Sequence, residues 1–248
     1  MILDLPNPPP RNDYASFSDE TGLTDTYMLI GGVACRSAFA QTIHDYICKV
    51  RSAGPFRESI QWKNFNARKL ALYHEVIDQF LYWNSEHLVD FHALVIDRRK
   101  LNNREYHGGD NELAFDKFMY TSLMALYGRY PDALRFRCVH GIRTSPYPLE
   151  AIRKKLNNTI AKPGNVFLQP YRELKYGVVQ QSGPLQLADL LLGIVGTAWN
   201  ADRRGTGDSR KELVEHFRRE CCVTRLNGKS PMACRHFDIW ELKMKGGQ

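Results

Sequence analysis

The chain has 248 residues, 43% of them hydrophobic and 25% charged, and 34 Lys and Arg against 27 Asp and Glu give a formal charge of +7. The length is sufficient for a sizeable core, the composition is that of a globular protein, and no apolar run is long enough to span a bilayer. The positive charge suits a polyanionic partner such as nucleic acid, although basic proteins without such partners are common. Asp4 and the prolines after it interrupt the first apolar residues, so we expect no signal peptide and a cytoplasmic protein with reduced cysteines.

Turn residues and hydrophobic periodicity divide the chain into an arm and one larger region. Residues 1–13 are rich in proline and predict an extended arm. Residues 14–248 predict one α/β domain with an inserted helix and a basic C-terminal helical extension. Strands are expected at 14–18, 27–34, 59–63, 88–97 and 134–140, with short candidates at 166–168, 175–179 and 239–240. Helices are expected to begin near Ser37, Asn66, Leu113, Pro148, Gly183 and Asp208.

The first informative residues are the adjacent acids Asp19 and Glu20, which follow the strand-like run 14–18 and precede a glycine. The second strand-like run, 27–34, completes a β-hairpin in which the two carboxylates point to opposite faces. A carboxylate at the end of a core strand is costly to desolvate unless a cation meets it. The two acids either open the turn, as acidic residues often do, or belong to a metal site.

Asp189 lies within the run Gly183–Gly196, which is apolar nearly all round and predicts a buried helix. An ionised aspartate there needs a cationic partner, either a metal ion or an arginine or lysine from elsewhere in the chain. The uniformly apolar helix favours the metal. Gly193 and Gly196 are expected to let the helix approach the sheet closely and place Asp189 against the strand ends.

Asp97 ends the clearest strand-like run of the sequence. It either starts the turn before the basic residues 98–100 or contributes to the same site as Asp19 and Asp189. Carboxylate oxygens are the ligands that Mg²⁺ or Mn²⁺ accepts, and such ions stabilise the attacking and leaving oxygens of a phosphodiester. The three aspartates therefore predict a divalent-metal site, with Glu20 as a supporting ligand or base.

Basic residues lie near these carboxylates in the sequence. Lys63 ends the short predicted strand and could contact a phosphate, although a surface lysine beside an aromatic anchor is the commoner explanation. The residues expected to contact the phosphates of nucleic acid are Lys63, Arg98, Arg99, Arg203 and Arg204. The alternatives are a solvated basic turn after Asp97 and an exposed basic helix face after the Asp189 helix.

Four motifs together resemble a bacterial family known as domain of unknown function 3800. They are Asp19–Gly22, Tyr27–Val33, Ile60–Lys63 and Leu185–Gly193, and the resemblance extends over residues 14–243. The Gln-x-Ala-Asp pattern within the last motif is the most specific mark of the family. The resemblance implies an α/β, ribonuclease H-like fold: a mixed five-stranded sheet, begun by an antiparallel meander, with helices around it.

The same resemblance implies a metal-dependent nuclease that hydrolyses phosphodiester bonds of DNA or RNA. Asp19 matches the family's ligand on the first strand, Asp189 its ligand on the last helix, and Asp97 an acid sometimes found after the fourth strand. His140 departs from the pattern, because many relatives carry aspartate at the end of that later strand. The site is therefore either modified by the histidine or weakened by it.

Two other functions compete with the nuclease. One is a non-catalytic nucleic-acid-binding or scaffold protein with a degenerate site, which the histidine and the basic C-terminal third favour. The other is action on a nucleotide or another small phosphorylated substrate through the same metal chemistry. Nucleic acid is the expected partner, and Cys221-Cys222 and the proline-rich arm could each contact a protein partner or a second copy of the chain.

Overall fold

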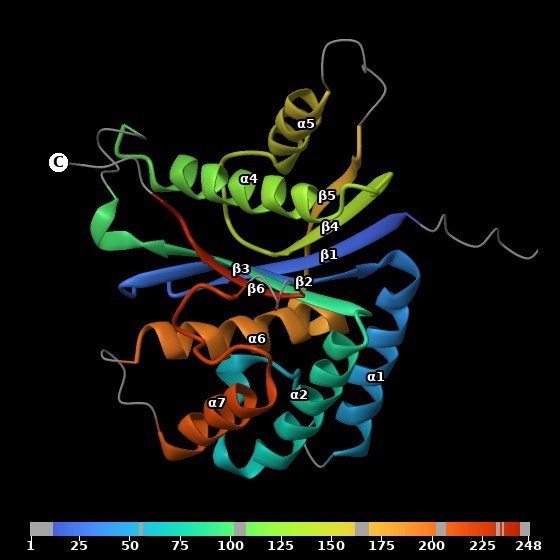
Figure 1. Cartoon of the computed structure of the whole chain (residues 1–248), viewed down its shortest axis with the longest axis vertical. Coiled ribbons are helices and arrows are strands. Elements are labelled where there is room, and N and C mark those ends of the chain that lie inside the picture. The colour runs from blue at the N-terminus through green and yellow to red at the C-terminus, as the bar shows by residue number, and fades with distance from the viewer. Residues whose placement is uncertain are drawn as a thin grey trace, which may run out of the picture.

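Six strands form one mixed sheet through the middle of the molecule (Figure 1). The computed structural model describes residues 12–54, 57–101, 108–161, 169–201, 207–231, 234 and 236–243. The strands are β1 (Asp13–Thr21), β2 (Tyr27–Arg36), β3 (Val89–Asp97), β4 (Arg135–Gly141), β5 (Tyr171–Gly177) and β6 (Phe237–Glu241). Their order across the sheet is β5-β4-β1-β2-β3-β6, so β1 lies inside the sheet.

The first three strands form an antiparallel meander, and each later strand runs parallel to its neighbour. β1 pairs with β2 and β2 with β3 in the antiparallel sense, whereas β4 joins β1, β5 joins β4 and β6 joins β3 in parallel. This is the arrangement expected of a ribonuclease H-like sheet. The expected number of five strands is wrong, because β6 adds a sixth strand beside β3. The parallel strands β1 and β4 end at the same edge of the sheet, which is where α/β folds place their sites.

Helices cover both faces of the sheet (Figure 1). On one face lie α1 (Ala40–Ala53), α2 (Leu70–Ser85), α6 (Gly183–Trp199) and α7 (Asp208–Glu220), and on the other α4 (Asn111–Arg129) and α5 (Leu149–Ile160). Among the described residues, no helix has both the length and the apolar composition that crossing a bilayer requires.

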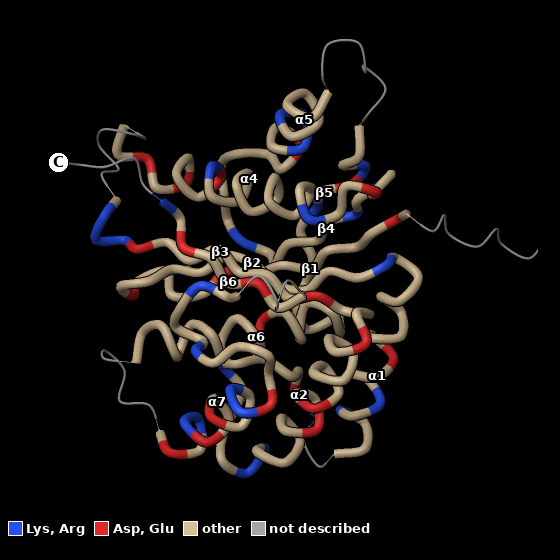
Figure 2. Tube along the Cα trace, viewed as in Figure 1, with Lys and Arg blue, Asp and Glu red and all other residues tan. Residues whose placement is uncertain are grey.

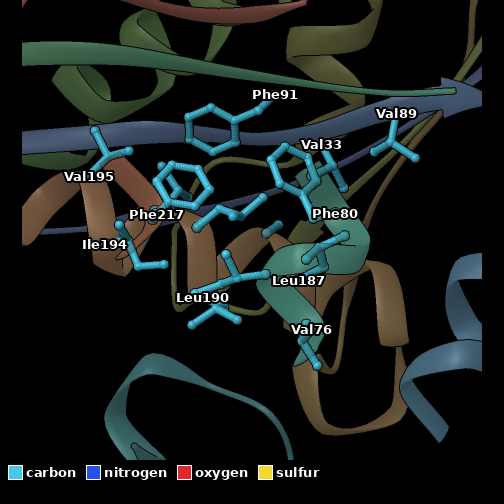
Figure 3. Packing of buried hydrophobic residues seen from close by; sticks show 14 of the residues in the cluster. Val33, Val76, Phe80, Val89, Phe91, Leu187, Leu190, Ile194, Val195 and Phe217 are labelled. Atoms are coloured by element: carbon cyan, nitrogen blue, oxygen red, sulfur yellow. The ribbon is translucent and has the colours of Figure 1, made fainter. Parts of the chain in front are cut away.

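The alternation of side chains along the strands divides the apolar residues between two cores, one on each face. Val33 and Phe91 point to the face of α2, α6 and α7, where they pack with Phe80, Leu190 and Phe217 (Figure 3). Residues one position along the same strands point to α4 and α5; Ala34, Leu94 and Ile96 are among them. β3 is buried at all nine positions because it lies inside the sheet and is covered on both faces.

α6 is the helix that brings the C-terminal part of the chain onto the first two strands. Its start is set by Ser182, whose hydroxyl accepts a hydrogen bond from the Leu185 amide, and by a proline in the first turn. Gly196 allows close contact with β1, since a Cβ there would lie 2.8 Å from Cγ2 of Thr21. At the end of the helix the Asn200 side chain bonds both the amide and the carbonyl of Tyr27 at 3.0 Å, which aligns α6 with β2.

Two other sequence expectations differ from the structure. The predicted strand at 59–63 is instead an irregular segment that enters η2 (Trp62–Asn64), a 3-10 helix, because its amides bond side chains of α6 rather than a neighbouring strand. Asp13, the last residue of the predicted arm, instead belongs to β1. The strand candidate at 166–168 and residues 1–11 of the arm lie outside the described residues.

Candidate active site

Asp19 lies near the carboxyl end of β1 and shares the α6 face with Ala15, because residues two apart on a strand point to the same side. Its Oδ1 accepts a hydrogen bond from the Glu20 amide at 2.9 Å. The carboxylate is pressed against Gly141 at the end of β4, where a Cβ would lie 2.4 Å from Oδ1. Only glycine at that position leaves the Asp19 carboxylate its space.

Asp189 reaches the same region from α6. Its Oδ2 accepts a hydrogen bond from the Trp62 amide at 2.6 Å, and Oε1 of Gln186, one helical turn earlier, accepts one from the Ile60 amide at 2.8 Å. The glutamine and aspartate of the motif therefore act together, since they bind two amides of the same extended segment. The contact is close because Gly193 lies beneath the indole, where a Cβ would come within 2.1 Å of Trp62 Cγ.

The two aspartates lie in a largely enclosed region where the positive charge nearby does not balance the negative charge. Burial raises the pKa of Asp19 to about 7, and the negative charges of Glu20 and Asp189 add to that effect. Burial also raises the pKa of Asp189, and the Trp62 amide and the Lys63 ammonium group offset it only in part. Paired oxygen ligands that resist ionisation for want of a cation are suited to a hard divalent ion. The chemistry of these two carboxylates thus suits Mg²⁺ or Mn²⁺.

Glu20 points to the opposite face of the sheet and has partners of its own there. Its Oε2 lies 2.9 Å from Nε2 of His140, and its Oε1 lies 3.9 Å from Nη1 of Arg143. Arg143 also donates from Nη2 to both carboxylate oxygens of Glu112, at 2.7 and 2.8 Å. Glu20 is only 10% exposed, so these contacts hold its carboxylate in one place beside Asp19.

The structure does not bring Asp97 to this site. Asp19 pairs across the sheet with Gly31 and Gly31 with Ala93, so Asp97 lies four residues farther along β3, about 13 Å at ~3.3 Å per residue. Its carboxylate instead accepts hydrogen bonds from the amide and the guanidinium of Arg99. These contacts hold the pKa of Asp97 below its usual range.

The basic residues expected at the site are also distributed differently. Lys63 is exposed and directly follows Trp62, whose amide binds Asp189, and its positive charge lowers the pKa of that carboxyl group. Arg98 and Arg99 lie in η4 (Arg98–Lys100), a basic segment at the end of β3 (Figure 2). There the Arg98 guanidinium donates to the Asp25 carbonyl, and that of Arg99 to Asp97 and the Tyr27 hydroxyl. Arg203 and Arg204 lie outside the described residues.

Two features of the site escaped the sequence analysis. His140 contacts Glu20 directly, and the guanidinium of Arg210 lies over the Trp62 ring at 5.2 Å from its centroid. The contact between His140 and Glu20 could have been predicted from the strand pattern. Ser18 and Glu20 point to the same face of their strand, so a residue of a neighbouring parallel strand that points to that face can contact both. The second depends on how α7 packs. Among the described residues, no group of three or more His, Cys, Asp or Glu side chains is arranged to hold a metal ion.

Comparison of the sequence with protein-family models and with curated proteins finds no match. Among solved structures, the chain is similar to one from the PCNA:RNase HII complex of Archaeoglobus fulgidus, with a TM-score of 0.44 and 10% identity over 82% of this chain and 87% of that chain. It is also similar to ribonuclease H2 from Pyrococcus horikoshii OT3, with a TM-score of 0.44 and 8% identity over 83% and 99%. Similarities this low assign neither a family nor an activity to the chain.

Proposed function

We propose that this protein is a Mg²⁺- or Mn²⁺-dependent nuclease that hydrolyses phosphodiester bonds of DNA or RNA, and that it belongs to the family its motifs resemble. The observation that carries the proposal is the buried pair Asp19 and Asp189 at the carboxyl end of β1. Burial raises the pKa of both groups, and the charges of Glu20 and Asp189 raise that of Asp19 further. Asp97 differs, because it is paired with a cation.

In this proposal each residue of the site has a distinct task. Asp19 and Asp189 would hold the ion, and bound there it would supply Lewis acidity and an activated water to the phosphodiester. The Trp62 amide fixes the orientation of the Asp189 carboxylate. Lys63, exposed beside Asp189, offsets the negative charge of an approaching phosphate. Glu20 stands next to Asp19 as a supporting ligand or base.

The competing function is a non-catalytic nucleic-acid-binding protein with the same fold. It is favoured by the finding that the described residues include no group of three candidate ligands, and by the contacts that already occupy Glu20. This alternative keeps Lys63 as a phosphate contact but needs neither aspartate for binding. The two functions therefore differ in what loss of the aspartates does.

The test is divalent-ion calorimetry followed by cleavage assays on single- and double-stranded DNA, RNA and an RNA–DNA hybrid. Asp19→Asn and Asp189→Asn are expected to abolish Mn²⁺ binding and to lower kcat/KM by roughly a thousandfold or more, because each removes a ligand of the ion. Asp97→Asn is the matched control, a strand-end aspartate outside the site, and should retain both properties. Cleavage that persists in both site variants would refute the nuclease, and salt-dependent binding without turnover would favour the alternative.

A further inference from the structure

The imidazole of His140 is completely buried and uses both of its nitrogens within the protein. Nδ1 lies 2.9 Å from Oγ of Ser18, and Nε2 lies 2.9 Å from Oε2 of Glu20. The side chain has 0% exposure, and the rings of Phe115 and Tyr176 lie beside it with centroids 5.9 and 6.3 Å away. A polar ring so enclosed is stable only because each nitrogen has a partner.

The register of the sheet explains how one histidine reaches two residues of the same strand. His140 on β4 lies directly opposite Ser18 on β1. Glu20 is two residues farther along β1, so its side chain points to the same face as that of Ser18. The imidazole therefore bridges successive positions of β1 on the α4 side, while Asp19 between them points to α6.

Hydrogen-bond chemistry favours one tautomer of the neutral ring. An ionised carboxylate only accepts hydrogen bonds, so the proton between His140 and Glu20 belongs to Nε2. Nδ1 of the neutral ring then carries a lone pair and accepts the hydroxyl proton of Ser18. With one nitrogen donating to Glu20 and the other accepting from Ser18, neither is left to ligate an ion.

We infer that His140 is a positioning residue, which holds the Glu20 carboxylate beside Asp19 and does not itself bind metal. The inference rests on the proposed function for the task of Glu20 and adds how that task is made possible. Arg143 approaches the other oxygen of Glu20, so the carboxylate is oriented from two sides. Groups that orient a metal ligand in this way control its affinity for the ion without touching it. The histidine neither modifies nor weakens the set of ligands; it orients one of them.

Two amide substitutions separate this role from simple filling of space. His140→Gln carries its NH₂ group far enough to replace Nε2–H and retain the bond to Glu20, whereas His140→Asn can replace only Nδ1 and retain the contact with Ser18. We expect the Gln variant to bind Mn²⁺ within about threefold of wild type and the Asn variant to bind it more than about tenfold more weakly. Thermal unfolding should show both variants folded, with similar midpoints, since both bury an amide of similar size.

Equal Mn²⁺ affinities in the two variants, or better retention in His140→Asn, would overturn the inference. Ring ¹⁵N NMR of the metal-free wild type supplies a readout that does not depend on the ion. A protonated Nε2 and unprotonated Nδ1, unchanged on addition of Mg²⁺, are expected, and a different tautomer or a ligation shift would also overturn it. NMR could show this tautomer while wild type binds no Mn²⁺ even with an oligonucleotide present. In that case the proposed function and the metal-positioning role are both refuted, and only the hydrogen bond from His140 to Glu20 is supported.

Discussion

Asp19 and Asp97 occupy equivalent places, each near the carboxyl end of an inner strand, and yet they behave in opposite ways. The pKa of Asp19 is raised to about 7 because the group is buried with Glu20 and Asp189 around it. Asp97 is buried as well, at 3% exposure, but Arg99 and Lys100 approach it to 2.8 and 3.5 Å and its pKa is lowered. Burial raises the pKa of each residue, but at Asp97 the hydrogen bonds and charge of Arg99 outweigh it, whereas at Asp19 the charges of Glu20 and Asp189 add to it.

The comparison shows which carboxylate is structural and which is a candidate for function. Asp97 caps η4 by accepting the Arg99 amide, and its charge is neutralised by its own turn. Asp19 has the Glu20 amide as a donor but has a second acid facing it from α6. A fold retains such repulsion only where another requirement outweighs it, as at functional sites.

The largest effect on stability is expected from filling the space between Gly193 and Trp62, whose amide binds Asp189. Gly193→Ala puts a Cβ 2.1 Å from Cγ of Trp62, at the rigid root of the indole, so η2 must move away from α6. We expect a loss of about 2–4 kcal/mol in the free energy of unfolding, because overpacking and a broken buried hydrogen bond add. Urea denaturation measures this loss.

Gly128→Ala is the control, because Gly128 is a helical glycine with nothing within 4 Å of the added Cβ. Its free energy of unfolding should increase by about 0.5–1 kcal/mol. Equal effects at the two glycines would contradict the assigned contact.

The second prediction is that substitution of the two aspartates changes the free energy of unfolding of the metal-free protein in opposite directions. The raised pKa of Asp19 means that the folded state holds this proton more tightly than the unfolded chain, so its contribution to stability falls as pH rises from about 4 to about 7. Asp19→Asn should therefore stabilise the protein at pH 8 by about 1–2 kcal/mol, and less at pH 4.5.

Asp97→Asn should do the reverse. Its lowered pKa contributes stability above the unfolded value near 4, and that contribution is lost as pH falls through the folded pKa. The variant is expected to lose about 1–2 kcal/mol at pH 8, because a cap and the hydrogen bonds of a buried carboxylate to the exposed Arg99 side chain are removed. Urea denaturation with a chelator present measures both variants. Destabilisation of similar size in both would show that Asp19 is structural as well.

The smallest expected effect is on oligonucleotide binding, and it distinguishes Lys63 from Arg99. Lys63→Gln should weaken oligonucleotide binding by roughly three- to tenfold and reduce the salt dependence by about one charge, because one phosphate contact is lost. Arg99→Gln should leave binding unchanged, since this guanidinium is bound to Asp97 and to the Tyr27 hydroxyl. Fluorescence anisotropy at two salt concentrations tests both. A larger effect at Arg99 than at Lys63 would place the nucleic acid at the end of β3 instead.

Much of the architecture could be predicted from the sequence because it depends on local pattern. The apolar run at residues 27–34, the apolar run before Asp97 and the continuous apolar surface of Gly183–Gly196 each reflect burial, and all three elements are present. The prediction of a strand at residues 59–63 was wrong because a local pattern does not show which groups bond the backbone. Its pattern is that of a strand, but its amides are taken by Gln186 and Asp189 rather than by another strand. Propensity is overridden where a side chain offers the hydrogen bond that a ladder would have supplied.

The sequence by itself determined that Asp19, Asp97 and Asp189 stand at the ends of buried strands or within a buried helix, since hydrophobic periodicity is a property of neighbours in the chain. Only the tertiary structure decided which of them meet. Parallel pairing of β1 with β4 set His140 beside Ser18 and Glu20, and the packing of α6 on β1 set Asp189 near Asp19. Asp97 is neutralised by residues of its own turn, whereas Asp19 meets a second carboxylate from a helix that is distant in the sequence. That difference in surrounding charge separates an aspartate that caps a turn from one suited to bind an ion.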